Sequence, residues 1–240
     1  MKRNYETVAL LPMKAHSARV PGKNFREFAG KPLFKWILDT LLAIDAIDAV
    51  IINTDARAIL AEHGLVETDR VLLRDRKQEL CGDTVSMNRV LRDDIEAINA
   101  NTYVMTHTTN PLLGSETIEL ALQEYQRAIS GQAHDSLFAV NKHQTRFYRE
   151  DGSAINHDPN NLVRTQDLEP WYEENSNLYI FSRGSFEVTS ARIGTKPMLF
   201  ESPVIESFDI DDEDGWQLAE LIAMHFLRAM TASVDGSESE

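Results

Sequence analysis

The sequence predicts an α/β fold built on a mostly parallel, doubly wound sheet. Short apolar runs of strand length alternate with longer segments of helical periodicity, and this alternation recurs along most of the 240 residues. Strands interleaved with helices are typical of parallel sheets that are covered on both faces. The expected strands are 7–11, 49–53, 70–73, 103–106, 137–140, 178–181 and 197–200. The expected helices are 32–44, 56–63, 83–97, 115–129 and 212–228.

The first elements follow from local signals. TVALL at 7–11 and AVIIN at 49–53 are continuous apolar runs, which is the pattern of strands buried on both faces. The helix expected at 32–44 carries apolar residues at helical spacing, and Pro32 suits its first position. The next helix is expected to end at Gly64, because glycine adopts the backbone conformation that terminates helices.

The later helices carry capping signals. An Asp-Thr pair at 83–84 suits the start of one helix, because short polar side chains accept hydrogen bonds from free N–H groups. Ser115 is expected to cap the next helix and Gly131 to end it. The last helix, 212–228, places apolar residues along one face and is therefore expected to pack against the body.

Two segments break the alternation. Residues 142–176 contain HDPNN and scattered aromatic residues but no amphipathic helix, so we expect an insertion of β-hairpin or loop character. Residues 231–240 are small and acidic, and we expect a disordered tail there. The sequence therefore predicts one catalytic domain over 1–230 that carries the insertion, followed by the tail.

Composition excludes several classes of protein. The formal net charge is −14, which disfavours binding to duplex nucleic acid. No uninterrupted apolar run approaches the roughly 18 residues of a membrane span, so no membrane association is expected. A single cysteine, Cys81, provides no disulfide framework and suits the reducing cytoplasm. Residues 1–35 nevertheless carry a net charge of +6, which fits a site for a small polyanion.

The most informative segment is LLPMKAHSARVPGKNF at 10–25. It leaves the first predicted strand, and ligands of open α/β sheets bind beyond the carboxyl ends of strands. Lys14, Arg19 and Lys23 could surround a polyphosphate, while loop N–H groups could add a concave anion site. The segment is neither a Walker loop nor a GxGxxG turn. The alternative interpretation is a basic loop exposed to solvent.

A second signal is the pair Asp209 and Asp211. Alternate residues of an extended segment project to the same side, and two converging carboxylates favour a bound cation. Oxygen ligands completed by substrate phosphates are how proteins usually hold Mg²⁺. The alternative is that these acids only supply negative charge at the start of the last helix. We assign that role to Asp212, Glu213 and Asp214 instead.

The sequence resembles the CMP-sialic acid synthetases, or acylneuraminate cytidylyltransferases. Besides the loop at 10–25, five further segments resemble motifs of that family, in family order across most of the chain: INTDARAIL (52–60), LLRDRKQELCGDTVS (72–86), THTTNPLL (106–113), ENSNLYIF (174–181) and SFDIDDEDGWQLAE (207–220). The resemblance implies a Rossmann-like nucleotidyltransferase fold. It also implies a homodimer formed through the small inserted subdomain, and activation of a 2-keto sugar acid by CTP with release of pyrophosphate.

The resemblance also implies roles for individual residues. Lys14, Lys23 and Asp211 would be catalytic, and Asp209 with Asp211 would hold Mg²⁺ or Mn²⁺. The set that would bind the nucleotide is Lys14, Ser17, Arg19, Lys23, Asn24, Arg74, Asp83 and Ser86. The set that would bind the sugar acid is His107, Arg164, Asn175 and Tyr179. For Tyr179, a purely structural place in the core is the alternative.

Two positions depart from the family pattern. Lys14 stands where the family usually has arginine, so the charge is kept but the bidentate geometry is lost. His107 stands where the family usually has a glutamine that contacts the sugar. Two other functions therefore stay open: a metal-dependent glycosyltransferase that uses Asp209 and Asp211, and a nucleotide-binding relative without activity.

Overall fold

The computed structural model describes the backbone of residues 3–236 and the side chains of residues 3–227. The strands are β1 (Asn4–Leu10), β2 (Glu27–Phe28), β3 (Lys31–Pro32), β4 (Ala49–Thr54), β5 (Val71–Asp75), β6 (Asn99–Thr106), β7 (Ser136–His143), β8 (Trp171–Phe181) and β9 (Pro197–Glu201). The helices are α1 (Leu33–Leu42), α2 (Arg57–Glu62), α3 (Met87–Ala97), α4 (Ser115–Ser130), α5 (Arg183–Thr189) and α6 (Glu213–Gly236). Within residues 3–236, no helix is long and apolar enough to cross a membrane.

Seven strands form the central sheet in the order β5-β4-β1-β6-β8-β7-β9. The pairs among β5, β4, β1 and β6 are parallel, as is β7 with β9. β8 runs antiparallel to both of its neighbours. The predicted α/β class and mostly parallel sheet are confirmed, with β8 as the exception. It is antiparallel because it returns directly from the hairpin that begins with β7, without a crossover helix.

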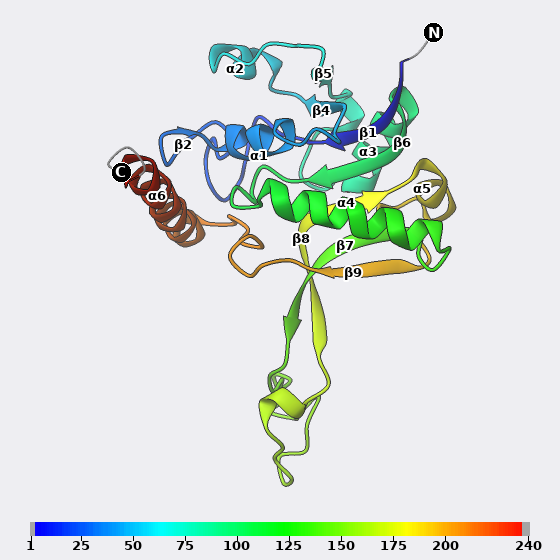
Figure 1. The fold of residues 1–240 in the computed structure, drawn as a ribbon, viewed down its shortest axis with the longest axis vertical. Helices are drawn as coiled ribbons and strands as arrows, with labels where there is room; N and C mark the ends of the chain where they lie inside the picture. The colour runs from blue at the N-terminus through cyan, green and yellow to red at the C-terminus, as the bar shows by residue number, and fades with distance from the viewer. Residues whose placement is uncertain (1–2, 237–240) are drawn as a thin grey trace.

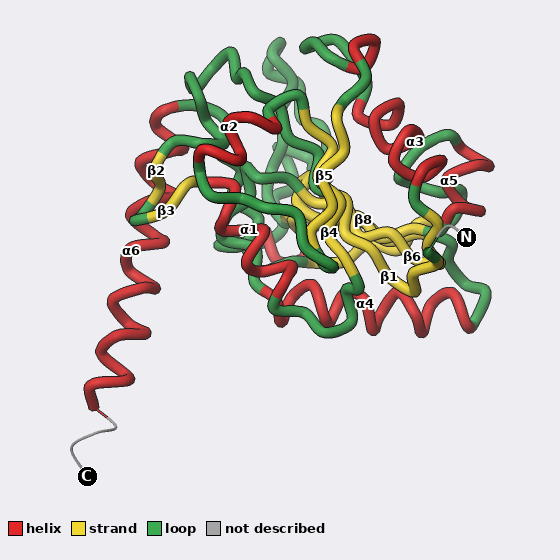
Figure 2. The backbone as a smooth tube through the Cα atoms, turned by 90° about the horizontal axis from the view of Figure 1, so that it is seen from above, coloured by secondary structure: helices red, strands yellow, loops and turns green. Residues whose placement is uncertain are grey.

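Helices cover both faces of this sheet, as Figure 2 shows. On one face, α1 and α4 pack on a cluster that includes Val50 and Val104. On the other face, α3 and α5 pack on a cluster that includes Ile51 and Tyr103. Neighbouring strand residues such as Val50 and Ile51 belong to opposite faces, and both are fully buried. Burial on both faces explains why the strands read as continuous apolar runs in the sequence.

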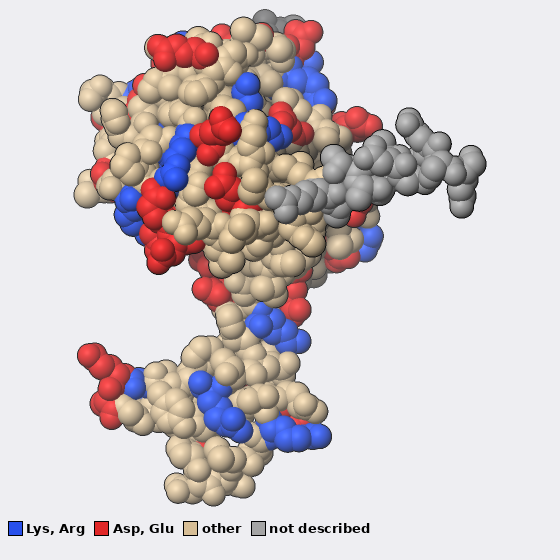
Figure 3. Space-filling model, turned by 90° about the vertical axis from the view of Figure 1, so that its left-hand side faces the viewer, with Lys and Arg blue, Asp and Glu red and all other residues tan. Residues whose placement is uncertain are grey.

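The insertion predicted at 142–176 is a projecting arm. β7 and β8 continue beyond the body as a two-stranded ribbon, and residues 144–170 form the far end (Figure 1). The pairing register shifts between Phe138 and Val140, where β8 contains extra residues. A bulge of this kind bends a strand, which accounts for the departure of the ribbon from the sheet. Figure 3 shows that a narrow waist joins the arm to the body.

Several predicted boundaries were wrong. α3 begins at Met87, because residues 83–85 form a turn after Gly82, whose φ is +107°. The Asp-Thr pair at 83–84 therefore does not cap it. Ser115 is the first residue of α4 rather than its cap. The free N–H of Gly114 instead donates to the carboxylate of Glu206 at 2.8 Å.

The C-terminal tail also differs from the expectation. The backbone of residues 231–236 continues α6 instead of being disordered, since extending an existing helix avoids the cost of nucleating a new one. Residues 237–240 of the predicted tail lie outside the described residues. Short elements that the sequence analysis missed are the β2–β3 hairpin and α5, which lack a long periodic pattern.

Candidate functional site

A cavity of about 400 Å³ opens at the carboxyl ends of the parallel strands β1, β5 and β6, next to the start of α3. This is the edge at which ligands of open α/β sheets bind. Its lining residues are Pro12, Lys14, His16, Ser17, Ala18, Arg19, Lys23, Asn24, Arg76, Leu80, Gly82, Asp83, Val85, Met87, Val90, His107, Thr108 and Thr109. Seven of the predicted site residues are in this set: Lys14, Ser17, Arg19, Lys23, Asn24, Asp83 and His107.

Asn24 fixes the loop that follows β1. Its amide nitrogen donates to the carbonyl oxygen of Lys14 at 2.8 Å, and its amide oxygen accepts from the Thr108 hydroxyl at 2.6 Å. Thr108 follows β6, so this one side chain ties the loop to the neighbouring strand end. Because both polar atoms of the Asn24 side chain are engaged, its observed role is to hold in place the loop that carries Lys14, Arg19 and Lys23.

Lys23 is the most enclosed cation of the loop, with 9% of its surface exposed. Its ammonium group donates to the carbonyl oxygen of Ile210 at 2.6 Å. Burial lowers the pKa of Lys23, while the negative charges of Asp209 and Asp211 oppose that shift. The loop after β1 and the acidic segment before α6 are therefore joined through this one side chain, 187 residues apart in sequence.

Asp209 and Asp211 are not among the residues that line the cavity. Asp211 forms an ion pair with Arg19 at 2.7 Å, between two exposed side chains. Partial desolvation of its carboxyl group and the nearby charge of Asp211 raise the pKa of Asp209, although residue 209 as a whole is exposed. The two carboxylates thus repel each other as the sequence predicted, and the Arg19 guanidinium occupies the position of a counter-cation.

The donor set fits Mg²⁺ only when a substrate contributes further ligands. Within residues 3–227, no group of three or more His, Cys, Asp or Glu side chains could hold a metal ion by itself. Two carboxylates, however, are what Mg²⁺ usually takes from a protein when phosphates and water supply the other oxygens. Asp209 and Asp211 are consistent with that kind of site.

Asp212 has the structural role that the sequence suggested for it. Its carboxylate accepts a hydrogen bond from the N–H of Gly215 at 2.8 Å, in the first turn of α6. Glu213 and Asp214 also lie in this first turn, where negative charge is favourable.

Across the cavity, Lys14 and Asp83 contact each other directly. The Lys14 ammonium donates to the Asp83 carboxylate at 2.7 Å, and this contact lowers the pKa of Asp83. Both side chains are substantially exposed, so the ion pair is weak, and an anionic ligand can displace Asp83 from Lys14. Ser86, by contrast, is exposed just before α3 and does not line the cavity.

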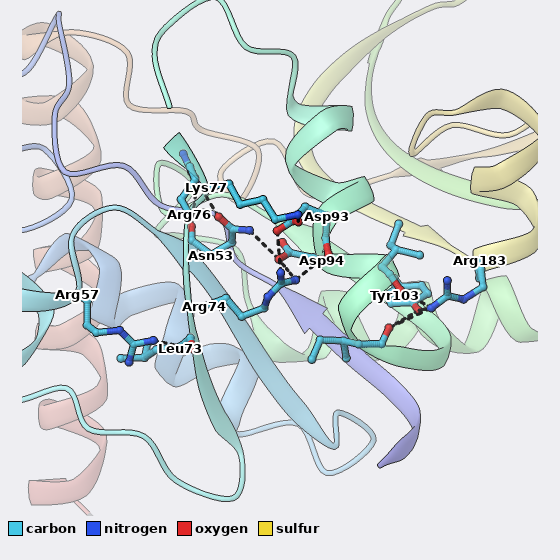
Figure 4. Close-up of polar contacts among 12 residues, drawn as sticks. Asn53, Arg57, Leu73, Arg74, Arg76, Lys77, Asp93, Asp94, Tyr103 and Arg183 are labelled. Atoms are coloured by element: carbon cyan, nitrogen blue, oxygen red, sulfur yellow. Dashed lines mark hydrogen bonds and ion pairs between the residues drawn. The ribbon is translucent and has the colours of Figure 1, made fainter. Parts of the chain in front are cut away.

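Arg74, the arginine predicted at the nucleotide site, does not line the cavity. Arg74 lies inside β5 and pairs with Asp93 and Asp94 of α3, at 2.7 and 2.9 Å. Arg76 follows the carboxyl end of β5 and lines the cavity instead (Figure 4). The signal that could have identified Arg76 is its place immediately after a predicted strand, since ligands bind at that edge.

At the other side of the cavity, His107 contacts a second polar cluster, which contains Arg192 and Tyr179. Arg192 donates to the His107 ring at 3.5 Å and to the Tyr179 hydroxyl at 2.8 Å. Burial, Arg192 and Lys23 together lower the pKa of His107 to about 3, so its imidazole is neutral at physiological pH. Arg192 was missed from the sequence, because it lies in an irregular segment after α5 that has no motif.

Tyr179 does not line the cavity. Its side chain is fully buried in the sheet, and burial raises the pKa of its hydroxyl. The Tyr179 hydroxyl donates to Glu174, and the Arg192 guanidinium lies 3.7 Å from the centre of the Tyr179 ring. The structural interpretation of Tyr179 therefore accounts for its place, and its link to the cavity runs through Arg192 and His107.

Two other residues predicted to bind the sugar are not brought to the cavity of this chain. Asn175 lies at the base of the arm, where its amide donates to Asn141 at 3.1 Å and to Ser202 at 2.8 Å. Arg164 lies on the arm, with 72% of its side chain exposed, and pairs with Asp167 at 2.7 Å. The family resemblance placed both near the site, and it could not show that Arg164 lies on an arm that projects from the body.

The cavity as a whole is built to receive an anion. Lys14, Arg19 and Lys23 on the loop after β1, and Arg76 after β5, present positive charge from two different parts of the chain. Asp83 and Asp211 hold two of these cations through exposed ion pairs, which solvent and ligands can replace at little cost. The arrangement can bind a polyphosphate and neutralise charge that develops on its oxygens.

Comparison with known proteins connects this cavity to a family. A family model described as cytidylyltransferase matches residues 8–229. The N-acylneuraminate cytidylyltransferase of Oncorhynchus mykiss is 28% identical over 91% of this chain, which spans 50% of that relative's length. The CMP-N,N'-diacetyllegionaminic acid synthase of Legionella pneumophila is 26% identical, and the match covers 89% of this chain and 94% of that protein.

The fold has solved counterparts. A CMP:2-keto-3-deoxy-manno-octonic acid synthetase, solved in complex with CTP, aligns with a TM-score of 0.64. The alignment covers 92% of this chain and 99% of that one at 13% sequence identity. At this level of identity the similarity shows the fold alone.

Proposed function

This chain belongs to the cytidylyltransferase family, and from that premise we propose that it transfers a cytidylyl group from CTP to a 2-keto sugar acid of the sialic-acid type. The products are the CMP-sugar acid and pyrophosphate. The observation that carries the proposal is the cavity at the strand ends, which four cations line. The names of the two relatives support a nonulosonic acid as the acceptor.

The proposed reaction is an in-line displacement at the α-phosphorus of CTP. A bond forms between the anomeric oxygen of the sugar and the α-phosphorus, and the bond from that phosphorus to the β-bridging oxygen breaks. The hydroxyl proton is released to solvent. Reactions of this class depend on positioning and charge stabilisation more than on covalent catalysis. In this chain, Lys14, Arg19 and Lys23 would hold the triphosphate and the departing pyrophosphate.

Asp209 and Asp211 would hold Mg²⁺ in this proposal. When bound, the ion would neutralise phosphate charge and lower the pKa of the attacking hydroxyl. Arg19 then has two partners available, the Asp211 carboxylate and the triphosphate, and we expect it to turn from the first to the second when CTP enters. Lys23 stays anchored on the Ile210 carbonyl between the acidic segment and the cavity.

The sugar acid would lie on the His107 side of the cavity. The neutral His107 ring can donate or accept a hydrogen bond. Arg192 lies directly behind His107 and is the cation that the body of this chain offers to the sugar carboxylate. The carboxylate of Glu174 now lies 3.4 Å from Arg192 and is 41% exposed, so it can give way to a substrate anion.

A panel of substrates tests the proposal. We expect pyrophosphate release from CTP with sialic, legionaminic or pseudaminic acid in the presence of Mg²⁺, and not from UTP or ATP. Equal turnover of UTP or ATP would contradict the cytidylyl assignment. Transfer of a sugar from a nucleotide sugar would favour the glycosyltransferase alternative, and CTP binding without turnover of any acid would favour the inactive relative.

We further propose that the protein is a cytoplasmic homodimer joined through the arm. The arm exposes a set of large apolar side chains: Tyr148, Ile155, Leu162, Val163, Trp171 and Tyr172. Exposed apolar patches of this kind mark interaction surfaces. In such a dimer, Arg164 would serve the cavity of the second copy rather than that of its own chain.

Light scattering checks the dimer. We expect twice the monomer mass at micromolar concentration, and a shift toward the monomer when Trp171 and Leu162 are both replaced by Asp. A monomeric wild-type chain would contradict the proposed interface.

A further inference from the structure

A chain of buried polar contacts runs from α3 to the cavity wall (Figure 4). The Asp94 carboxylate accepts a hydrogen bond from the Asn53 amide nitrogen at 2.7 Å. The Asn53 amide oxygen in turn accepts from Nε of Arg76 at 3.0 Å, and the Asn53 carbonyl accepts from Nη2 of Arg76 at 2.7 Å. Asp94 and Asn53 are fully buried, and Arg76 is 8% exposed and lines the cavity.

The order of these contacts fixes the Asn53 amide in one orientation. Its nitrogen faces a carboxylate and its oxygen faces a guanidinium, so each polar atom meets the opposite partner. A flipped amide would place oxygen against the Asp94 carboxylate and N–H against the N–H of Arg76. Ionised Asp94 therefore selects the orientation that gives Arg76 its acceptor.

Arg76 donates its side-chain hydrogen bonds to the side-chain and main-chain oxygens of Asn53. No ion pair to Arg76 is present among the described side chains, although the charges of Asp55 and Asp94 favour its charged form from a longer distance. The neighbouring cations are neutralised differently: Arg74 and Lys77 pair directly with acidic residues of α3. Arg76 thus has no directly paired carboxylate at the cavity wall, and its hydrogen bonds to Asn53 set its direction.

Asp94 itself is only half satisfied. Its Oδ1 atom accepts from Asn53 and from Arg74, whereas its Oδ2 atom is buried without a partner. Burial raises the pKa of Asp94 to about 6, and nearby Asp93 adds to the shift, while Asn53, Arg74 and Arg76 oppose it. Keeping a buried and partly unpartnered carboxylate ionised costs free energy. Orientation of Asn53 by the charge of Asp94 is a role that accounts for this cost.

We propose that Asp94 is a positioning residue that acts through Asn53 to hold the Arg76 guanidinium in the direction from which it contacts the nucleotide. The inference rests on the proposed function, because it takes the ligand of the cavity to be CTP. Asp94 does not touch the substrate. It sets the geometry of a residue that does, and its loss would therefore weaken nucleotide binding without removing a contact.

Adjacent Asp93 provides a matched control. Asp94→Asn removes the charge that selects the Asn53 orientation, and we expect the CTP dissociation constant, measured by titration calorimetry, to rise about tenfold. The maximal turnover rate should change little. Asp93→Asn breaks the contacts to Arg74 and Lys77 but leaves Asn53 and Arg76 untouched, so it should alter melting temperature and not CTP affinity.

A swapped pair and a pH profile add readouts that a purely structural role would not move. The double variant Asn53→Asp with Asp94→Asn keeps a donor at 94 and an acceptor toward Arg76, and it should restore most of the CTP affinity. In the wild type, the dissociation constant should rise as pH falls through about 6, because Asp94 becomes protonated. The ratio of the Asp94→Asn dissociation constant to the wild-type value should therefore fall toward one over the same range.

The outcomes separate the possibilities. An unchanged CTP affinity in Asp94→Asn, or an equal loss in Asp93→Asn, would overturn the positioning role. A swapped pair that stays as weak as Asp94→Asn would overturn the argument from amide orientation. A wild-type chain that binds no CTP would instead overturn the proposed function on which the inference rests.

Discussion

Asp211→Asn should lower turnover by at least a hundredfold while the protein remains folded. Stabilisation of phosphate charge by a metal is worth several kcal/mol in the transition state, and about 1.4 kcal/mol corresponds to a factor of ten in rate. The substitution keeps the shape of the side chain but removes one ligand charge. The ion pair with Arg19 that it also removes is exposed and therefore contributes little to stability. Steady-state kinetics and a melting curve on the same variant measure both effects.

Asp212→Ala is the matched control. Asp212 caps α6 through the N–H of Gly215, so its loss should cost about 1 kcal/mol of stability and leave turnover near normal. Chelation with EDTA should stop the wild-type enzyme, and Mg²⁺ or Mn²⁺ should restore it. A stable Asp211→Asn protein with wild-type turnover would show that this carboxylate holds no catalytic metal and only supplies charge near α6.

Lys23→Met should weaken CTP binding by about tenfold to a hundredfold. Hydrogen bonds to charged groups contribute about 1.5–3 kcal/mol, and methionine fills the same space without the charge. Because burial lowers the pKa of Lys23, wild-type affinity for CTP should also fall with rising pH, beginning below the usual lysine value of 10.5. Titration calorimetry with CTP over a pH series measures both effects.

Lys196→Met serves as the control for charge alone, because Lys196 is exposed at the far edge of the sheet next to β9. Its loss removes the same charge from the protein but should leave CTP affinity within about twofold. Equal effects of the two substitutions would mean that net charge, and not the position of Lys23, governs nucleotide binding.

Much of the fold could be predicted because its signals are local. A strand buried on both faces must be continuously apolar, as AVIIN in β4 is, and an amphipathic helix must repeat its apolar residues, as α4 does. Part of the site could be predicted for the same reason. Lys14, Lys23 and Asn24 lie on one short loop, so their proximity is fixed by the sequence itself.

Other residues predicted for the site do not line the cavity, and the sequence could not show this because it depends on where side chains point in space. Arg74 and Arg76 are two residues apart, and the acidic pair on α3 decides that Arg74 turns away from the cavity. The bulge in β8 carries Arg164 outward on the arm, which no spacing in the sequence encodes.

By itself, then, the sequence determined the α/β class, the cationic loop after β1 and the acidic pair before α6, because each depends on residues that are near neighbours in the chain. Only the tertiary structure decided that Arg76 and Arg192 flank the cavity and that Asp94 reaches it through Asn53. The physical reason is that these contacts join residues dozens of positions apart. Their geometry is set by the packing of α3 and α5 against the sheet.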